Sequence, residues 1–206
     1  MAQNNLEIEV KFYIIRLADI SASLLRLGAK PVQPRTHEIN LRFDTPGADL
    51  TRRLQVLRLR QDDKARITYK GPGQLAGGTR VRQEIEFVAS DFDSARLLFE
   101  ALGYQVILMY EKFRTTFDLG DVHVSLDEMP YGNFVEVEGP DPESIHHTAQ
   151  ILGLDWEARI LDSYTVLFEN LRATLGFTFR DLSFANFKEI QVSSYILNLK
   201  PGDRGQ

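Results

Sequence analysis

The chain has 206 residues, a formal net charge of −5 and no cysteine, and its hydrophobic and charged fractions of 43% and 26% are ordinary for a folded domain. The acidic balance disfavours nucleic acid as a partner, and the lack of cysteine excludes disulfides, thiolate zinc sites and cysteine nucleophiles. No apolar run reaches the roughly 20 residues that cross a bilayer, and the N-terminus lacks the pattern of a signal peptide. We therefore expect a cytoplasmic protein that does not bind membranes.

Strand-like and helix-like segments alternate along most of the chain. Period-two alternation predicts eight strands, at residues 5–15, 36–44, 54–61, 65–70, 80–89, 106–118, 121–128 and 133–139. Helical spacing predicts four helices, at residues 17–28, 91–102, 142–152 and 163–175. The glycines between residues 71 and 78 lack the order of a phosphate-binding loop, and we interpret them as a hairpin connection.

The segment from Gly176 onward differs from the rest. It combines aromatic residues with a β-branched stretch and ends in polar residues. It could be an extra strand packed on the domain or an arm that binds a partner. We therefore divide the chain into a domain at residues 1–175 and a C-terminal extension at 176–206 of unknown role, with its last residues disordered.

Charged side chains gather on one face of the predicted strands, since successive side chains of a strand point to opposite faces. The charged residues that share such a face are Glu7, Glu9, Lys11, Arg58, Arg60, Arg66, Lys70, Arg80, Arg82, Glu84, Glu86, Lys112, Arg114, Asp127, Glu136 and Glu138. In any one strand this face could simply be the solvated side of a sheet. The joint pattern, with amphipathic helices that must cover an apolar sheet face, favours a closed barrel with the charges inside.

A charged lumen would be a poor core, because buried ion pairs rarely stabilise more than apolar side chains would. Arginine and lysine supply donors and positive charge to phosphate oxygens. Clustered carboxylates would repel phosphate unless they held a hard divalent cation. The combination predicts a polyphosphate site with Mg²⁺ or Mn²⁺. The four histidines lack ligand spacing, and we assign them no role.

A specific series of motifs accompanies this pattern. An E-x-E-x-K motif at Glu7–Lys11 is followed by L-R-L-R at 57–60, T-Y-K-G-P at 68–72, R-x-E-x-E at 82–86, E-K-x-R at 111–114 and L-D-x-x-x-x-G-x-F-V-E-V-E at 126–138. Their order and spacing resemble the CYTH superfamily, the triphosphate tunnel metalloenzymes, which include class IV adenylyl cyclases and thiamine triphosphatase-like proteins. The resemblance implies an α+β fold, a closed eight-stranded antiparallel β-barrel (a tunnel) with a charged interior and flanking helices.

The resemblance also implies roles for individual residues. The implied phosphate-binding residues are Lys11, Arg58, Arg60, Lys70, Arg82, Lys112 and Arg114. The implied metal ligands are Glu7, Glu9, Asp127, Glu136 and Glu138, and the implied catalytic residues are Glu7, Glu9 and Lys11. Ser163 and Tyr164 resemble a late S-Y pair of the family. Arg66 and Arg80 match no motif and could be salt-bridge partners instead.

Two departures leave the activity open. Cyclases of the family often carry a His-Phe element before E-x-E-x-K, where this chain has residues 3–5 (QNN), and thiamine triphosphatase-like members carry a tyrosine where it has Arg42. The leading hypothesis is a metal-dependent triphosphate phosphohydrolase acting on tripolyphosphate, ATP or thiamine triphosphate. The alternatives are a class IV adenylyl cyclase, which converts ATP into cyclic AMP and pyrophosphate, and a non-catalytic polyphosphate-binding module. The oligomeric state is not readable, although the aromatic tail could support a homodimer.

Overall fold

The computed structural model describes residues 6–203. Its strands are β1 (Leu6–Ile14), β2 (Lys30–Asp44), β3 (Val56–Gln61), β4 (Ala65–Lys70), β5 (Gln74–Ala76), β6 (Thr79–Ala89), β7 (Gln105–Leu119), β8 (Val122–Met129), β9 (Gly132–Glu138) and β10 (Arg159–Ile160). Its helices are α1 (Leu17–Arg26), α2 (Asp49–Arg52), α3 (Phe92–Ala101), α4 (Pro142–Ile151) and α5 (Tyr164–Leu175), with a 3₁₀ turn at Trp156–Ala158.

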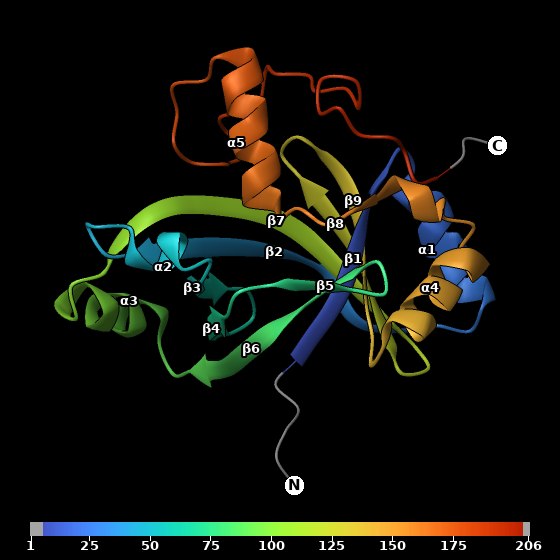
Figure 1. Cartoon of the computed structure of the whole chain (residues 1–206), viewed down its shortest axis with the longest axis horizontal. Helices are drawn as coiled ribbons and strands as arrows, with labels where there is room; N and C mark the ends of the chain where they lie inside the picture. The colour runs from blue at the N-terminus through green and yellow to red at the C-terminus, as the bar shows by residue number, and fades with distance from the viewer. Residues whose placement is uncertain (1–5, 204–206) are drawn as a thin grey trace, which may run out of the picture.

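Eight of these strands form a closed antiparallel ring. Their order is β1-β9-β8-β7-β2-β3-β4-β6, and β6 pairs again with β1. In the closing pair Glu7 lies opposite Arg82. The short strands β5 and β10 add to the outer edges of β6 and β1. The predicted closed eight-stranded antiparallel barrel with flanking helices, and its α+β class, are therefore confirmed (Figure 1).

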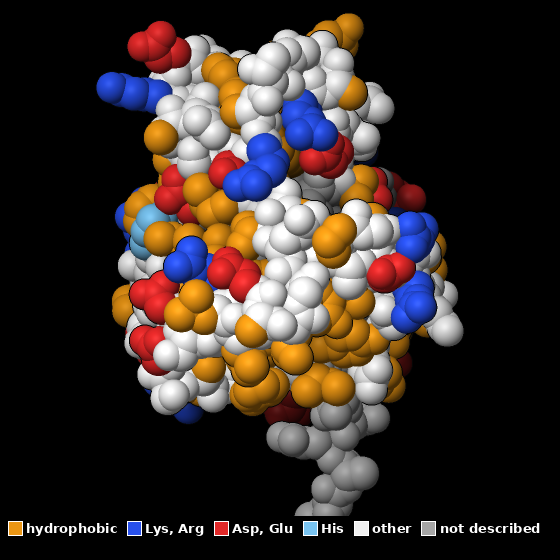
Figure 2. Space-filling model, turned by 90° about the vertical axis from the view of Figure 1, so that its left-hand side faces the viewer, with side chains coloured by type: hydrophobic (Ala, Val, Ile, Leu, Met, Phe, Trp, Pro, Cys, Tyr) orange, Lys and Arg blue, Asp and Glu red, His pale blue; other side chains and the backbone are white. Residues whose placement is uncertain are grey.

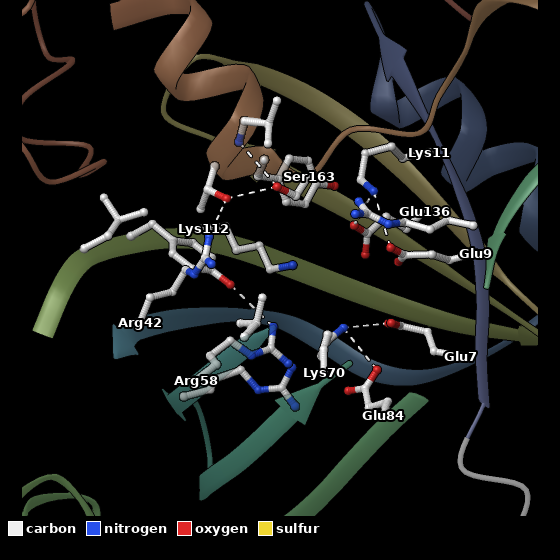
Figure 3. Close-up of a pocket in the computed structure, with 18 of the residues that line it drawn as sticks. Glu7, Glu9, Lys11, Arg42, Arg58, Lys70, Glu84, Lys112, Glu136 and Ser163 are labelled. Carbon is white, nitrogen blue, oxygen red and sulfur yellow. Dashed lines mark hydrogen bonds and ion pairs between the residues drawn. The ribbon is translucent and has the colours of Figure 1, made fainter. Parts of the chain in front are cut away.

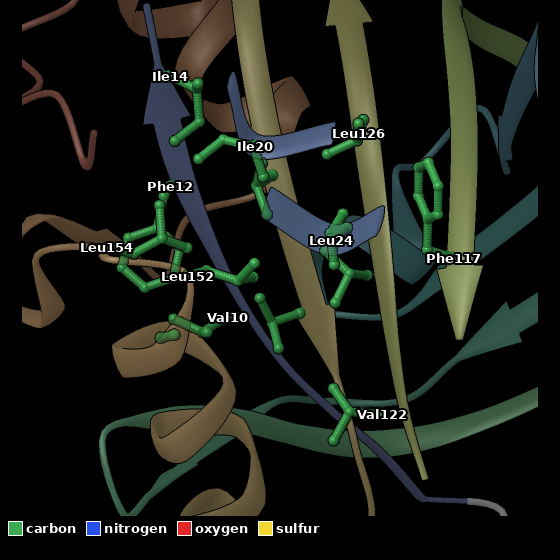
Figure 4. Close-up of a cluster of buried hydrophobic side chains, with 14 of the residues drawn as sticks. Val10, Phe12, Ile14, Ile20, Leu24, Phe117, Val122, Leu126, Leu152 and Leu154 are labelled. Carbon is green, nitrogen blue, oxygen red and sulfur yellow. The ribbon is translucent and has the colours of Figure 1, made fainter. Parts of the chain in front are cut away.

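Helices lie where the strands present apolar faces outward. Val10 and Phe12 of β1 are buried in one cluster with Leu24 of α1 and Ile145 of α4 (Figure 4). A second cluster joins α3 to the outer face of β2 and β3. Because the apolar residues of each strand are used on the outside, the alternating charged residues are turned inward. No helix among residues 6–203 is long and apolar enough to cross a membrane.

The segment after α5 packs back on the barrel and fills an open edge of β7. Strand β8 pairs with β7 only from Phe113 onward, so the preceding edge is free. Leu182 uses this edge: its N–H donates to the Met109 carbonyl (2.9 Å), and its own carbonyl accepts from the Glu111 N–H (3.1 Å). Leu182 is fully buried. The tail therefore lies on the domain, without a regular strand of its own among the described residues.

The predicted segment boundaries differ from the observed ones in places. Strand β2 begins at Lys30 rather than residue 36, because Pro31 and Pro34 and two register shifts interrupt its early alternation. The short elements α2, β5 and β10 were missed, since they span too few residues to show a period. The glycines at 77 and 78, both at positive φ, connect β5 to β6 as the predicted hairpin. The domain boundary at residue 175 stays a prediction, and the disorder predicted for the chain end falls partly on residues 204–206, outside the described residues.

Candidate active site

The ring encloses a cavity of about 820 Å³ that the charged strand faces line. The predicted inward residues found in its wall are Glu7, Glu9, Lys11, Arg58, Arg60, Lys70, Arg80, Arg82, Glu84, Glu86, Lys112, Arg114, Glu136 and Glu138. Asp127 is fully buried behind this wall. Arg66 is not among the lining residues and pairs with Asp62 (3.1 Å), as a salt-bridge partner would. The parity analysis thus places these side chains correctly, and Asp127 and Arg66 are the two predicted inward residues that do not line the cavity.

Carboxylates gather at one end of the tunnel, where β1, β6 and β9 meet (Figure 3). Glu7 accepts hydrogen bonds from Lys70 Nζ and Arg82 Nε, both at 2.7 Å. Glu84 lies 3.0 Å from Lys70 Nζ, so one lysine serves two carboxylates. Glu138 lies opposite Glu9 in the β1–β9 ladder. In the described part of the chain, no lysine or arginine forms an ion pair with Glu138.

Because these charged groups lie so close together, the pKa values of the carboxylates at this end differ widely. Burial would raise the pKa of Glu7, but Lys70 and Arg82 hold it well below its usual range. Desolvation, with the added charge of Glu7, raises the pKa of Glu84 to about 7 despite Lys70. Desolvation and the charges of Glu7, Glu84 and Glu9 likewise raise the pKa of Glu138 to about 7. Glu138 reaches solvent at the tunnel opening, which screens part of this effect. Glu84 and Glu138 are therefore the carboxyl groups of this end that keep their protons to higher pH.

Cations occupy the middle of the tunnel. Lys11 lies 3.6 Å from both Glu9 and Glu136. Arg114 also binds Glu136, and with Lys11 it holds the pKa of that buried carboxyl well below its usual range, against the effect of burial. Lys112 Nζ, 3.0 Å from Asp127, points into the cavity (Figure 3). These side chains present positive charge to the lumen.

Asp127 anchors the basic residues from behind. Arg114 donates to both of its carboxylate oxygens, at 2.6 and 2.5 Å. Asp127 also accepts hydrogen bonds from Lys112 and from the hydroxyl of Tyr164. These contacts support a positioning role, and its implied role as a metal ligand stays a prediction.

The wall formed by β3 and β4 is mainly basic. Arg58 donates to Thr68 (3.1 Å), and Arg58 and Arg60 share Glu86 at 3.4 and 3.2 Å. Arg58 also lies 3.4 Å from the Tyr110 hydroxyl. Burial would raise the pKa of Tyr110, but Arg58 and Lys112 lower it. This wall lies across the tunnel from the paired carboxylates of β1 and β9.

Strand β2 contributes three polar residues whose roles the sequence analysis missed, at alternate positions 38, 40 and 42. Glu38 is fully buried, 3.6 Å from Arg60 and 3.7 Å from Lys112. Asn40 is also fully buried, and Arg42 lines the cavity. The same period-two sorting applied to residues 36–44 would have found all three.

Helix α5 begins at one mouth of the tunnel. Ser163 caps it by accepting a hydrogen bond from the Val166 N–H (3.3 Å). The ring of Tyr164 lies 5.4 Å from Lys11 Nζ and 5.3 Å from Lys112 Nζ. The two residues of the S-Y pair therefore both contribute to the site, one as a helix cap and the other beside the lumen cations.

The carboxylate end of the tunnel suits a hard divalent cation. In residues 6–203 no three carboxylates or histidines already stand in a metal-binding arrangement. However, Glu7, Glu9 and Glu138 all line the same end. The pKa of Glu138 is raised first by burial and then by the negative charges of Glu7, Glu84 and Glu9, which a bound cation would offset. Oxygen ligands of this kind favour Mg²⁺ or Mn²⁺ over zinc. The donor set therefore fits the predicted metal.

A closed tunnel with lumen-facing cations and a carboxylate end is the arrangement of the triphosphate tunnel fold. Comparison with known proteins supports this fold assignment. The CYTH domain family model matches residues 5–163. A Methanocaldococcus jannaschii protein named as a candidate adenylate cyclase is 28% identical over 135 residues, covering 65% of this chain and 76% of that protein. This chain belongs to the CYTH domain family.

Solved structures support the same fold. A Vibrio parahaemolyticus protein described as a candidate adenylate cyclase has a TM-score of 0.73 at 24% identity, covering 81% of this chain and 99% of that chain. A Hippeastrum protein, described as a candidate adenylyl cyclase with a dominant triphosphatase activity, has a TM-score of 0.58 at 16% identity and covers 79% of this chain and 95% of that one. At these identities the likeness establishes the fold alone.

Proposed function

We propose that the chain is a divalent-metal-dependent enzyme that binds a triphosphate in its tunnel and hydrolyses it. The observation that carries the proposal is the separation of charge along one closed cavity. A cluster of carboxylates lies at one end, where Glu138 has no ion-pair partner among the described residues, and a mainly basic surface occupies the middle and the far wall. A metal–polyphosphate complex has the matching distribution, because its cation would lie at the carboxylates and its oxygens along the basic surface.

In this proposal the chain binds and positions its substrate, and no covalent nucleophile is required. Lys11, Lys112 and Arg114 would neutralise the phosphate oxygens and the charge that develops on them during transfer. Asp127 holds Arg114 and Lys112 in place from behind. Glu7, Glu9, Glu136 and Glu138 would hold Mg²⁺ or Mn²⁺, which when bound supplies Lewis-acid activation. In this proposal the enzyme acts in the cytoplasm.

The second candidate is a class IV adenylyl cyclase, in which the ribose 3′-hydroxyl of ATP attacks the α-phosphate and pyrophosphate leaves. The name of the Methanocaldococcus jannaschii relative favours this candidate. The description of the Hippeastrum protein favours the hydrolase, because it reports dominant triphosphatase activity in a protein named as a cyclase. One tunnel could serve either reaction, since the outcome depends on which phosphorus atom faces the nucleophile.

Product analysis separates the candidates. The purified chain would be incubated with Mg²⁺ or Mn²⁺ and either tripolyphosphate or ATP, and products resolved by ion-exchange chromatography. Release of orthophosphate supports the hydrolase, and cyclic AMP with pyrophosphate supports the cyclase. Tight binding of both compounds with no product would leave the non-catalytic polyphosphate-binding module. The predicted homodimer stays a prediction that sedimentation analysis would check.

A further inference from the structure

One edge of β6 is left open where the barrel closes. Strand β1 pairs with β6 only as far as Gln83, which lies opposite Leu6. Residues 84–89 pair with β4 on one side, and no strand among residues 6–203 pairs with them on the other (Figure 1). We propose that this edge is the interface of a homodimer, in which β6 of a second copy of the chain pairs with it in an antiparallel arrangement. The inference does not depend on the proposed function.

The first argument is that this edge is both apolar and exposed. Ile85, Phe87 and Val88 are 41%, 55% and 52% exposed, whereas Val10 and Phe12 of the neighbouring β1 are buried under helices. Val88 lies on the opposite face of the strand from Ile85 and Phe87, so both faces are open to solvent here. Aromatic and β-branched residues favour strand pairing. Further hydrophobic side chains gather on the side of the molecule that carries α3 (Figure 2).

The second argument is that the edge lacks the features that keep exposed strands from pairing. Such strands are commonly protected by lysine, proline, a bulge or an outward charge. Residues 84–89 contain no lysine or proline, and their ladder with β4 has no register shift. Glu84 and Glu86 point into the lumen, where Glu84 lies 3.0 Å from Lys70 and Glu86 lies 3.2 Å from Arg60. Their charges therefore do not oppose the approach of a second copy.

The third argument concerns the two ends of the chain as alternative covers. Asp203 accepts a hydrogen bond from the Ile15 N–H (2.9 Å), and Ile15 lies about 30 Å along β1 from Leu6 and the open edge. Residues 204–206 span at most about 11 Å, so they do not reach it. Residues 1–5 (MAQNN) precede Leu6 directly, but asparagine is a poor strand former and this segment has little apolar surface to offer Phe87.

The aromatic tail, which the sequence suggested as a dimer contact, is also committed elsewhere. Its side chains Phe177, Phe179 and Phe187 pack with Phe168 of α5 in the cluster that includes Tyr110 of β7. This packing removes the tail from the candidate dimer contacts. The open edge of β6 is the better candidate, because it combines exposed apolar side chains with unpaired backbone.

A second copy fits the edge because an antiparallel edge is self-complementary. A two-fold axis brings residues 84–89 of one copy antiparallel to the same residues of the other, so that unpaired N–H and C=O groups of both gain partners. With the axis at Phe87, this residue faces its own counterpart, and Ile85 faces Ala89. Apolar side chains then meet apolar side chains, while Glu84 and Glu86 stay directed into their own barrels.

Sedimentation velocity of the full chain tests the proposal. For the wild type we expect the mass to move from monomer toward dimer as the concentration rises through the micromolar range, because the interface is small. Phe87→Lys places a charge on the edge and should leave the chain monomeric over that range. Leu25→Lys places the same charge on α1, where Leu25 is 56% exposed, and should dimerise like the wild type. Both variants should keep the circular dichroism of the wild type, since both side chains are exposed.

An engineered thiol reports the two-fold contact directly, because the chain has no cysteine. Opposed Cα atoms of an antiparallel pair lie about 4.5–5.5 Å apart, which is within the range of a disulfide. Phe87→Cys should therefore form a disulfide-linked dimer under mild oxidation, and Leu25→Cys should stay monomeric. A Phe87→Cys variant that cross-links no faster than Leu25→Cys would overturn the two-fold pairing.

Two further results would overturn the interface, namely a wild type that stays monomeric at every concentration and a dimer that Phe87→Lys leaves intact. A variant that lacks residues 1–5 tests the other occupant of the edge. If that variant dimerises and the full chain does not, the N-terminal residues cover the edge and the proposal is wrong. Equal dimerisation of the two supports a second copy. None of these measurements involves turnover, so a failure of the proposed hydrolase would leave the interface unaffected.

Discussion

The hydroxyl of Tyr164 donates a hydrogen bond of 2.8 Å to Oδ2 of Asp127, which joins the first turn of α5 to the tunnel wall. Because the same carboxylate holds Arg114 and Lys112, the position of the helix and the position of the lumen cations are coupled. Burial and the Asp127 charge hold the pKa of Tyr164 well above its usual range, so its hydroxyl keeps the proton that it donates.

Tyr164→Phe should therefore destabilise the fold by about 1–3 kcal/mol, because a buried carboxylate loses a donor while the ring stays in place. Urea unfolding would measure the change. Tyr195→Phe is the matched control, since the Tyr195 side chain is 91% exposed and should be insensitive. Equal stability of Tyr164→Phe and the wild type would mean that the hydrogen bond contributes nothing.

Arg58→Ala should weaken tripolyphosphate binding by about 1.5–3 kcal/mol, the range for a hydrogen bond to a charged group. Arg58 lines the lumen, where it also pairs with Glu86, and it is not one of the proposed metal ligands. The affinity for tripolyphosphate should therefore fall both with and without metal. Arg66→Ala serves as the control, because Arg66 lies outside the lining and pairs with Asp62. Calorimetric affinities that are unchanged in Arg58→Ala would remove this residue from the binding surface.

Turnover should disappear in EDTA and return with Mg²⁺ or Mn²⁺. Glu136→Gln should lose most activity, because a proposed metal ligand is lost. It should keep or strengthen metal-free triphosphate binding, since Arg114 and Lys11 lose a competing partner. Glu143→Gln, on the outer helix α4, is the control. Full activity of the wild type in EDTA would contradict a metal mechanism.

The raised pKa of Glu84 predicts a pH dependence of stability in the metal-free protein. Its folded pKa is about 7 and its reference value is 4.5, so between these values the folded state binds more protons than the unfolded state. Stability should therefore fall as pH rises from 4.5 through 7. Thermal unfolding at pH 6 and pH 8 should show this decline, with greater stabilisation by Mg²⁺ at pH 8.

Glu84→Gln should make that decline shallower, leaving the part due to Glu138, whose pKa is also raised to about 7. Glu100→Gln, at an exposed position of α3, should leave the decline unchanged. If both variants retain the wild-type slope between pH 6 and pH 8, Glu84 is not the group that titrates.

Leu182→Ala should destabilise the fold by about 2–5 kcal/mol, because Leu182 is fully buried between the tail and the barrel. Amide exchange should quicken at Met109 and Glu111, whose N–H groups are bonded to Asp181 and Leu182. The control is Leu97→Ala at an exposed position. Unchanged exchange at both amides would show that the tail does not protect this edge of β7.

An exposed hydrophobic surface lies on the side of the molecule that carries α2 and α3. Figure 2 views this side and shows hydrophobic side chains gathered on its lower half. The exposed apolar residues here are Leu97 and Leu98 of α3, Leu102 directly after it, and Ile85, Phe87 and Val88 of β6. Among residues 6–203 no helix covers this outer part of β6, which explains why Ile85 and Phe87, on the apolar face of the strand, are exposed.

Local alternation was enough to predict which side chains enter the tunnel. Glu7, Glu9 and Lys11 face inward because Val10 and Phe12 must be buried against helices. The pairing of Glu7 with Lys70 and Arg82 was not predictable in the same way. It depends on β4, β6 and β1 becoming neighbours, a matter of strand order that alternation within one segment does not encode.

The tail was harder to predict for a different reason. Its aromatic and β-branched residues have no regular period, because they pack individually against α5 and β7. Arg42 was noticed only as a departure from a family pattern. Its inward position became evident from its register with Arg58.

The double pairing of β1 has a consequence for how the chain acquires its structure. This strand is synthesised before both of its ring partners, β6 and β9, which end at residues 89 and 138. During synthesis β1 therefore stays unpaired on at least one side, with its apolar residues exposed, until residue 138 has been made. Closure through contacts so distant in sequence is slow. A chaperone that binds nascent apolar segments would be expected to act on residues 6–14.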